Sequence, residues 1–267
     1  MSQYSMHKKS WSQILFRSLI TLIFIVALIY PFWYPAPKIK PQQEPETALL
    51  LVPDFAKIRS VKKKKQAFFS YLRPELEKQN RVIKQERRFL LELRQKVQQG
   101  KPPSANEQQR LTTLAVQYQM NGAPENEVQW NTLLRRVDTI PVELTLVQAA
   151  NESAWGTSRF AKHGYNFFGL WCYRKGCGFV PKQRDEEAAH EVAKFRDLSH
   201  AVRTYLLNLN SYYAYSDLRM IRADLRQKEQ SLTPEAIAQG LINYSTRREE
   251  YVDELVAMIR HNRKYMQ

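Results

Sequence analysis

The segment Ser18–Tyr34 carries no charged residue and is almost entirely apolar, with the sequence SLITLIFIVALIYPFWY. The apolar stretch reaches back to Ile14, interrupted only by Arg17. A helix needs about 20 mostly apolar residues to span a bilayer, and an arginine side chain can extend to the interface. The segment 14–34 therefore predicts a transmembrane helix, and a buried helix of a globular core is the weaker interpretation.

The charges before this segment predict its orientation. Lys8, Lys9 and Arg17 precede the apolar run without any acidic residue, which places residues 1–13 in the cytoplasm and the rest of the chain across the membrane. A cleaved signal peptide is the alternative. Because Tyr-Pro-Ala-Pro follows the run instead of a small-residue cleavage site, we favour a retained anchor. Residues 35–53 contain several prolines and predict a semi-rigid linker.

The composition excludes several classes of protein. The 41 Lys and Arg residues exceed the 26 Asp and Glu residues, for a net charge of +15, while the chain has only 8 Gly and 2 Cys. These numbers rule out collagen-like and disulfide-rich scaffolds. Lys62–Lys65 form a basic cluster that we interpret as a solvated helix face, with anionic lipid or cell-wall polymer as alternative partners. No nucleic-acid motif accompanies the charge, so we predict no nucleic-acid partner.

Residues 54–137 predict an N-terminal helical region. Leu76, Ile83 and Leu90 recur every seven residues and form an apolar stripe that predicts packing on the downstream domain. Pro74 predicts a break that divides the stretch 54–99 into two helices. Ser104 and Glu107 have the spacing of a capping box at the start of a further helix.

The segment that begins at Asp138 contains the residue with the clearest chemical potential, Glu152. Pro141 suits the first turn of a helix and Gly156 suits its end, so Glu152 falls in the last turn among apolar neighbours. Burial and the negative end of the helix dipole both disfavour the charged carboxylate and should raise its pKa. Cleavage of a glycosidic bond by a general acid needs such a protonated carboxyl. An ordinary exposed glutamate paired with Arg159 or Lys162 is the alternative.

The string from Gln148 to Trp171, QAANESAWGTSRFAKHGYNFFGLW, resembles the signature of the bacterial glucosaminidases of glycoside hydrolase family 73. More closely, it resembles the bacterial Bax-type glucosaminidases, as does the upstream string DFAKIRSVKKKKQAFFSYLRPEL. The resemblance covers roughly residues 54–265. It is strongest at Glu152, Ser153, Trp155, Gly156, Asn166, Phe168 and Gly169.

This resemblance implies a mainly helical, α+β, lysozyme-like domain over residues 138–267, with a small β-hairpin lobe beside a cleft. It also implies hydrolysis of the β-1,4 bond between N-acetylglucosamine and N-acetylmuramic acid in peptidoglycan, with Glu152 as the general acid and without a cofactor. The expected location is the inner membrane, with the catalytic domain in the periplasm. The alternatives are a catalytically silent glycan-binding protein and a membrane-tethered adaptor of the cell envelope.

Family members also have a tyrosine before the C-terminal helix, and the string LINYSTRREEY identifies it as Tyr244, with Ser245 in place of the usual alanine. We expect Tyr244 to orient an N-acetyl group or a water, and a core tyrosine is the alternative. Thr246 and Glu249 predict a capping box at the start of that helix.

The family places a second carboxylate on the hairpin lobe, upstream of Phe195-Arg196. We predict Glu191 in this role, because the alternating run HEVAKF indicates a strand, and Glu187 is the second choice. A solvated hairpin edge is the alternative reading of both. Assistance by the N-acetyl group of the substrate would make a second carboxylate dispensable.

Substrate contacts are expected from residues around the motif, because aromatic faces pack against sugars and polar groups orient them. About half of the aromatic residues should instead belong to the core. The predicted substrate-binding residues are Gln148, Tyr165, Asn166, Phe168, Trp171 and Tyr213.

Cys172 and Cys177 frame a short loop and should form a disulfide in an oxidising compartment. A zinc site or a redox pair is the alternative. Zinc would need two further ligands, and His190 alone does not supply them. We therefore predict no metal.

Overall fold

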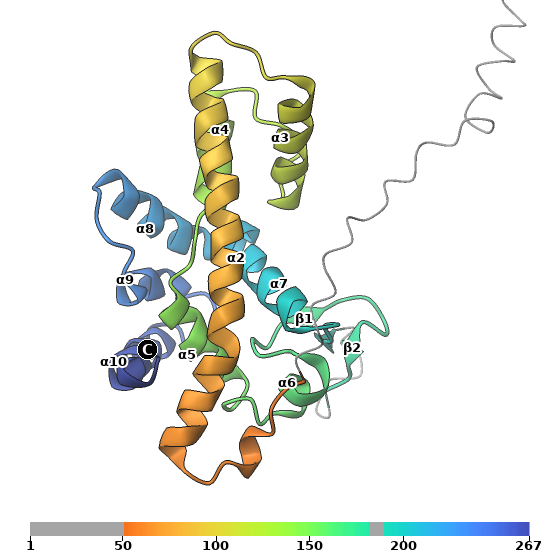
Figure 1. Ribbon diagram of the computed structural model, residues 1–267, viewed down its shortest axis with the longest axis vertical. Coiled ribbons are helices and arrows are strands. Elements are labelled where there is room, and N and C mark those ends of the chain that lie inside the picture. Colours follow the sequence, from red (N-terminus) through yellow and green to blue (C-terminus); the bar gives the residue numbers. More distant parts are fainter. Residues whose placement is uncertain (1–50, 182–189, 267) are drawn as a thin grey trace, which may run out of the picture. The chain divides into compact units, whose positions relative to one another are not determined.

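The computed structural model describes residues 51–181 and 190–266 (Figure 1). These described residues belong to one compact unit that is mainly helical with one small sheet, in agreement with a lysozyme-like fold. Its helices are α2 (Val61–Gln98), α3 (Ala105–Gln117), α4 (Glu127–Arg136), α5 (Val142–Glu152), α6 (Arg159–Gly164), α7 (Leu198–Ser211), α8 (Ser216–Gln227), α9 (Pro234–Ala238) and α10 (Glu249–Asn262). Short 3₁₀ turns are η1 (Phe55–Lys57), η2 (Tyr213–Tyr215), η3 (Gln239–Leu241) and η4 (Arg263–Tyr265).

The predicted membrane segment 14–34 lies outside the described residues, as does most of the predicted linker 35–53. Among the residues that the structure describes, no helix combines the length and the apolar character needed to cross a bilayer.

Helix α2 runs unbroken through Pro74, so the predicted break at this proline is wrong. A proline inside a helix costs about 3 kcal/mol, because it lacks an N–H group and crowds the preceding turn. Phe68, Phe69, Leu72 and Leu76 are all buried on either side of it. Burial of each such side chain contributes roughly 1.5–3 kcal/mol, so packing outweighs the local cost of the proline.

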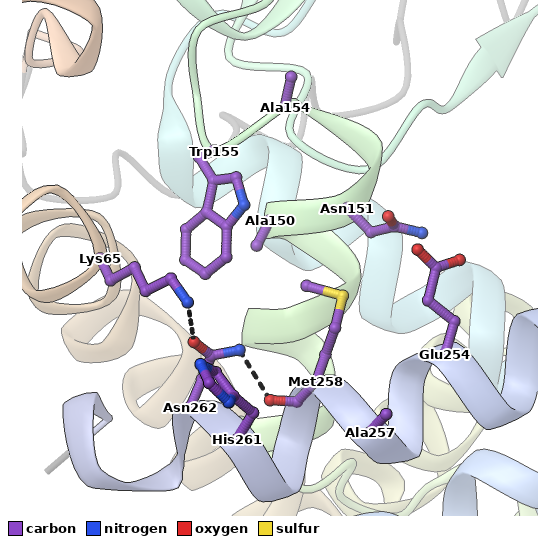
Figure 2. Close-up of a pocket in the computed structure, with 10 residues that line it drawn as sticks. All are labelled: Lys65, Ala150, Asn151, Ala154, Trp155, Glu254, Ala257, Met258, His261 and Asn262. Carbon is purple, nitrogen blue, oxygen red and sulfur yellow. Dashed lines mark hydrogen bonds between the residues drawn. The ribbon is translucent and has the colours of Figure 1, made fainter. Parts of the chain in front are cut away.

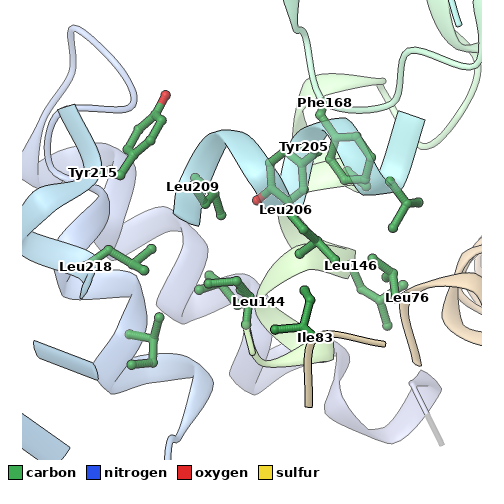
Figure 3. Close-up of a cluster of buried hydrophobic side chains, with 14 of the residues drawn as sticks. Leu76, Ile83, Leu144, Leu146, Phe168, Tyr205, Leu206, Leu209, Tyr215 and Leu218 are labelled. Carbon is green, nitrogen blue, oxygen red and sulfur yellow. The ribbon is translucent and has the colours of Figure 1, made fainter. Parts of the chain in front are cut away.

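Helix α5 lies inside the compact unit and is covered by α2, α9 and α10 (Figure 1). All residues from Leu144 to Ala150 are buried, so this helix has no solvent-facing stripe over that stretch. Figure 3 shows Leu76 and Ile83 of α2 against Leu146 of α5, with Leu206 of α7 on the other side. The heptad stripe of α2 therefore packs on the downstream segment, as predicted.

One hydrophobic core extends from Phe55 to Met266 and is continuous across Val137. Helices α3 and α4 flank the C-terminal part of α2 (Figure 1). The predicted regions 54–137 and 138–267 thus share a core, and the boundary between them remains a prediction.

The sheet contains three short antiparallel strands in the order β1-β3-β2: β1 (Trp171–Cys172), β3 (Glu191–Ala193) and β2 (Gly178–Phe179). Val192 lies opposite both Trp171 and Phe179, so β3 is the central strand. The predicted small β lobe is present, and the strand expected in HEVAKF is its central member.

The two predicted capping boxes have different outcomes. At α3, Ser104 and Glu107 form the reciprocal capping box as expected. At α10 the predicted box of Thr246 and Glu249 is wrong, because the helix begins at Glu249 after Arg248, which has a positive φ of 50° and no side-chain cap. A cap contributes only about 1 kcal/mol, and the tertiary contacts of Tyr244 and Tyr251 on either side of this turn outweigh it.

Candidate active site

Glu152 is the last residue of α5 and so lies in the last turn of this helix, as predicted. Three consecutive residues after it, Ala154, Trp155 and Gly156, have positive φ values of 50°, 58° and 74°. The chain therefore leaves the helix in a left-handed turn. The predicted helix end at Gly156 is wrong, because α5 already ends at Glu152. Ser153 stabilises this turn, since its hydroxyl donates to the carbonyl of Ala149 and accepts from the N–H of Gly156.

Aromatic packing holds the turn in place. The Trp155 ring contacts Phe68 and Phe69 of α2 edge-on, with centroids 5.7 and 5.4 Å apart. At Gly156, a Cβ atom would lie 2.5 Å from the ring of Phe55, so any larger residue would displace that ring. The Trp-Gly pair of the motif thus connects the end of α5 to the N-terminal part of α2.

A directional chain of hydrogen bonds reaches the Glu152 carboxylate. The Tyr251 hydroxyl of α10 donates to Glu152 Oε1 at 3.0 Å and accepts from Gln148 Nε2 at 3.2 Å. Gln148 Oε1 in turn accepts from the Tyr205 hydroxyl of α7. Gln148 is fully buried, so its predicted contact with substrate is replaced by a positioning role between two tyrosines.

The other oxygen of the carboxylate lies against the backbone of Gly169. A Cβ atom at this glycine would lie 3.2 Å from Glu152 Oε2, and the φ of 64° is one that side chains rarely adopt. Glycine is therefore needed here for conformation and for space. This explains why a Phe-Gly pair follows the glutamate in the motif.

The electrostatic setting of Glu152 shifts the pKa of its carboxyl upward. Burial raises the pKa of this carboxyl above its ordinary value, while the Tyr251 hydrogen bond and the Arg247 charge lower it and the Glu254 charge raises it. Burial wins, so the net shift of the pKa is upward, as the sequence predicted. A raised pKa increases the protonated fraction of the carboxyl at a given pH, and the protonated form can deliver its proton to a bound group.

Asn166 and Phe168, predicted to bind substrate, organise the loop between α6 and the sheet instead. The Asn166 amide donates to the carbonyls of Leu170 and Ala193, at 2.8 and 2.9 Å, and its oxygen accepts from the N–H of Leu170. Phe168 is buried and stacks on Tyr205 at 3.9 Å. These contacts fix the loop that carries Gly169 on both sides of this glycine.

Tyr244 lies close to the carboxylate but its hydroxyl has a protein partner. The hydroxyl donates to the carbonyl of Phe168 at 2.8 Å, and the ring stacks on Tyr251 with centroids 5.5 Å apart. Burial raises the pKa of Tyr244 well above its ordinary value, so it remains a donor. Through this hydrogen bond and this ring contact, Tyr244 links the loop that contains Phe168 to α10.

A line of tyrosine rings connects Glu152 to the surface. Successive ring pairs have centroids 4.6 to 6.1 Å apart. The outermost ring, Tyr213, is 76% exposed, and the innermost donates to Glu152. The rings are Tyr213, Tyr212, Tyr215, Tyr244 and Tyr251.

The remaining predicted aromatic contacts divide between surface and core. Trp171 is 51% exposed, with its ring 3.8 Å from that of His190. Tyr173 on the following loop is also exposed. Tyr165 is half-buried and packs on the core, so it offers less of its face to a sugar. Trp171 and Tyr213 therefore remain accessible for glycan stacking.

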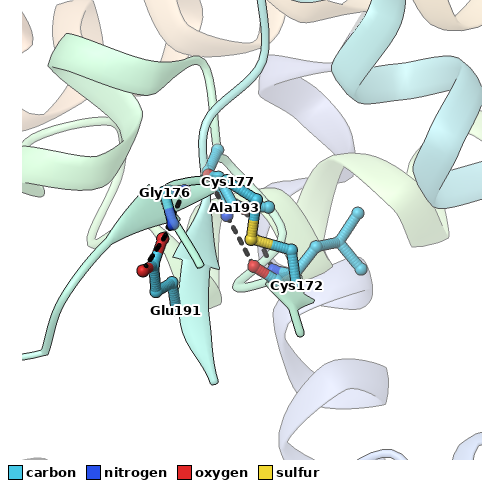
Figure 4. Close-up of a disulfide and its surroundings, with 8 residues drawn as sticks. Cys172, Gly176, Cys177, Glu191 and Ala193 are labelled. Atoms are coloured by element: carbon cyan, nitrogen blue, oxygen red, sulfur yellow. Dashed lines mark hydrogen bonds between the residues drawn. A yellow bond between two sulfur atoms is a disulfide. The ribbon is translucent and has the colours of Figure 1, made fainter. Parts of the chain in front are cut away.

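Glu191 lies at the disulfide and is almost fully buried (Figure 4). Its two carboxylate oxygens accept from the N–H groups of Gly176 and Gly178, at 2.9 and 2.8 Å. Cys172 and Cys177 are bonded to each other, which confirms the predicted pairing. The sulfurs and a Glu191 oxygen lie within 4.8 Å of one another, but disulfide sulfurs are not the thiolates that bind zinc. Glu187 lies outside the described residues.

A cavity of about 630 Å³ adjoins the end of α5, between α2 and α10 (Figure 2). Figure 2 shows Asn151 of α5 directed toward Glu254 of α10, with Trp155 and Lys65 on the opposite wall. The Lys65 ammonium donates to Asn262 and lies 5.1 Å from the Trp155 ring centroid. Glu152 does not line this cavity, but its neighbours Asn151 and Ala154 do.

Sequence reasoning missed Tyr251 and Glu254, which act on Glu152 from about one hundred residues downstream. Tyr251 ends the string in which Tyr244 was identified, and its place in the first turn of a helix was the available signal. Tyr205 is fully buried, and nothing local in the sequence indicated its hydrogen bond to Gln148.

The helical fold, with a partly buried carboxyl held at a helix end, is compatible with a glycosidase-type enzyme, and a comparison with known families supports this class. The sequence profile of the glucosaminidase family, described as mannosyl-glycoprotein endo-beta-N-acetylglucosaminidase, matches residues 129–264. The chain therefore belongs to the glucosaminidase family.

A particular relative supports this assignment. The chain is 35% identical over 214 residues to the protein called bax of Escherichia coli (strain K12), an alignment that covers 80% of this chain and 75% of the relative. No solved structure matches the chain significantly.

Proposed function

We propose that this protein is a peptidoglycan hydrolase that cleaves the β-1,4 bond between N-acetylglucosamine and N-acetylmuramic acid, with Glu152 as the general acid. The observation that carries the proposal is the raised pKa of a half-buried carboxyl that Tyr251 and Gly169 hold on its two sides. Membership of the glucosaminidase family supports the substrate class.

In the proposed reaction, the Glu152 proton passes to the glycosidic oxygen as the bond to the anomeric carbon breaks. The departing sugar leaves as a neutral alcohol, and positive charge develops on the ring that remains. Hydrogen bonding by Tyr251 stabilises the resulting Glu152 carboxylate. Water then completes the hydrolysis.

The reaction needs a second group that acts together with Glu152. The geometry of Glu191 tests whether this residue can be that group. Both oxygens of Glu191 are engaged by backbone N–H groups, so catalysis by this residue would require breaking two charge-assisted hydrogen bonds inside the lobe. We therefore favour assistance by the N-acetyl group of the substrate, with Tyr244 near the reacting sugar. Glu187 stays an alternative second carboxylate.

The proposed setting is the periplasmic side of the inner membrane, with residues 14–34 as the anchor. This part of the proposal rests on the apolar run 14–34 and on the positively charged residues that precede it. The bond between Cys172 and Cys177 agrees with an oxidising compartment.

The decisive experiment compares Glu152→Gln with wild type on purified peptidoglycan. We expect the amide to lower turnover by about 10²-fold or more, because general-acid catalysis typically contributes 10²–10⁴-fold. Mass analysis of the soluble fragments from the wild type should find N-acetylglucosamine at the new reducing ends.

The matched control is Glu143→Gln, at the other end of α5, where the side chain pairs with Arg73. This variant should keep wild-type turnover. Undiminished cleavage by Glu152→Gln would contradict the proposal. No cleavage by the wild type, with glycan binding intact, would instead favour a silent binding protein, and loss of both would favour the adaptor.

A further inference from the structure

A second cavity, of about 400 Å³, lies at the junction of α2, α4 and α8, next to the N-terminal side of α5. Glu152, at the far end of α5, is not among its lining residues. Six arginines from these elements line it: Arg87, Arg94, Arg135, Arg219, Arg222 and Arg226.

The charges in this cavity are not balanced. Asp138 is the acidic residue among the lining side chains. Six arginines against one aspartate leave a surplus of five positive charges, or four once Glu127, the ion-pair partner of Arg94, is counted. Like charges this close raise the free energy of the empty cavity, and an anion would relieve that repulsion.

The two most buried arginines are held by neutral acceptors. Arg222 is almost completely buried and donates to the backbone carbonyls of Arg135, Asp138 and Thr139. Arg219 donates to the carbonyls of Leu209 and Tyr212. These contacts fix the guanidinium groups without neutralising their charge, so an arriving ligand does not have to order them.

Asp138 serves several arginines at once. Arg226 binds it through two nitrogens, at 3.1 and 2.9 Å, while Arg87 and Arg222 approach its carboxylate at 3.6 and 3.8 Å. Burial and the neighbouring arginines lower the pKa of Arg222 to about 10. One carboxylate is therefore shared among three guanidinium groups.

The mouth of the cavity carries further positive charge. Arg135 is exposed, and its Nη2 donates to the hydroxyl of Thr132 at 3.1 Å. Arg226 is 41% exposed. An anion that enters from solvent would meet these two residues first.

We propose that this cavity is a binding site for a phosphoryl group. A monoanionic carboxylate would offset one of the four surplus charges, whereas a phosphate carries about two negative charges and three or four acceptor oxygens. Arginine forks bind such oxygens in pairs. The site is independent of the glycosidase chemistry at Glu152.

The test titrates the detergent-solubilised full chain with inorganic phosphate and with glycerol 3-phosphate, by calorimetry at constant ionic strength set with chloride. We expect saturable binding and a rise in the thermal unfolding temperature. Equal affinity for the two probes would mean that the site takes free phosphate, and tighter binding of glycerol 3-phosphate would point to a lipid headgroup. Both results support a phosphoryl site.

The variant Arg135→Gln should weaken binding about tenfold, because a charged hydrogen bond is lost. Arg135→Lys should weaken it less than Arg135→Gln does, because lysine keeps the charge but not the paired donors. Arg260→Gln, an exposed arginine on α10, is the matched control and should bind as the wild type does. The proposal is overturned if neither probe saturates beyond the chloride background, or if Arg135→Gln and Arg260→Gln behave alike.

Discussion

Tyr251 is the single residue with the most direct influence on Glu152, because its hydroxyl donates to the carboxylate at 3.0 Å. The bond has two effects. It holds Oε1 in one place, and it stabilises the charged form, which lowers the pKa of Glu152 against the larger effect of burial. Tyr205 and Gln148 fix the direction of this bond from behind.

The variant Tyr251→Phe should separate these two effects. We expect turnover to fall about tenfold because a hydrogen bond to a charged group is lost. The pKa of Glu152 should rise further, since a contribution that lowered it is gone. A general acid acts only when protonated, so activity is lost as pH rises through this pKa, and the alkaline limb of the pH–rate profile should move to higher pH.

Turnover measured across pH checks this prediction, with Tyr265→Phe as a control outside the hydrogen-bond chain. A purely structural tyrosine would reduce turnover at every pH by the same factor. An unmoved alkaline limb in Tyr251→Phe would therefore count against its action on Glu152.

At the scale of elements, the small sheet depends on a carboxylate and a disulfide that support the same loop. Glu191 of β3 accepts from Gly176 and Gly178, and the Cys172–Cys177 bond closes the loop beside it. At Gly178 a Cβ atom would lie 2.0 Å from the carbonyl oxygen of Val192, so the strands approach too closely for a side chain there.

Replacement of Glu191 by glutamine tests whether this carboxylate is structural. The amide oxygen of glutamine can accept a hydrogen bond from only one of the two N–H groups, so the other bond is lost. We therefore expect the free energy of unfolding to fall by about 1–2 kcal/mol. Turnover per folded molecule should stay within a few-fold of the wild type. Urea unfolding followed by peptidoglycan digestion measures both quantities, and a loss of turnover as large as that of Glu152→Gln would restore Glu191 as the second catalytic carboxylate.

Across the whole molecule, α2 connects the N-terminal helices to the site. Its residue Phe68 is fully buried and contacts Phe55, Phe69, Trp155 and Phe167. Two of these partners, Trp155 and Phe167, belong to the motif and lie on either side of α6, so the packing of α2 helps to fix the position of the turn after Glu152.

The variant Phe68→Ala should lower the free energy of unfolding by about 3–5 kcal/mol, the usual cost of removing a buried phenylalanine from a well-packed core. Denaturant unfolding gives this number directly. Val82→Ala, at a partly exposed position on the same helix, should change stability by less than about 1 kcal/mol. Equal effects of the two variants would show that the α2 packing is not as described.

Local patterns were sufficient for those parts of the molecule that depend on neighbours in sequence. The motif around Glu152 predicted its place in the last turn of a helix, its apolar setting and the upward shift of its pKa, because the apolar neighbours and the helix-ending residues lie within two turns of it. The run HEVAKF predicted a strand, and two cysteines five residues apart predicted a disulfide.

Long-range packing decided the remaining features of the fold and the site. Its free energy outweighs local preferences, and it brings together residues that lie far apart in the sequence. Pro74 stays inside a helix because the buried aromatic and leucine side chains around it contribute more than the proline costs. Gln148, Asn166 and Phe168 hold the loops in place because their polar groups or rings meet partners on other elements. Neither the hydrogen bond from Tyr251 to Glu152 nor the cluster of arginines around Asp138 has a local signature, since each assembles only when helices distant in sequence pack together.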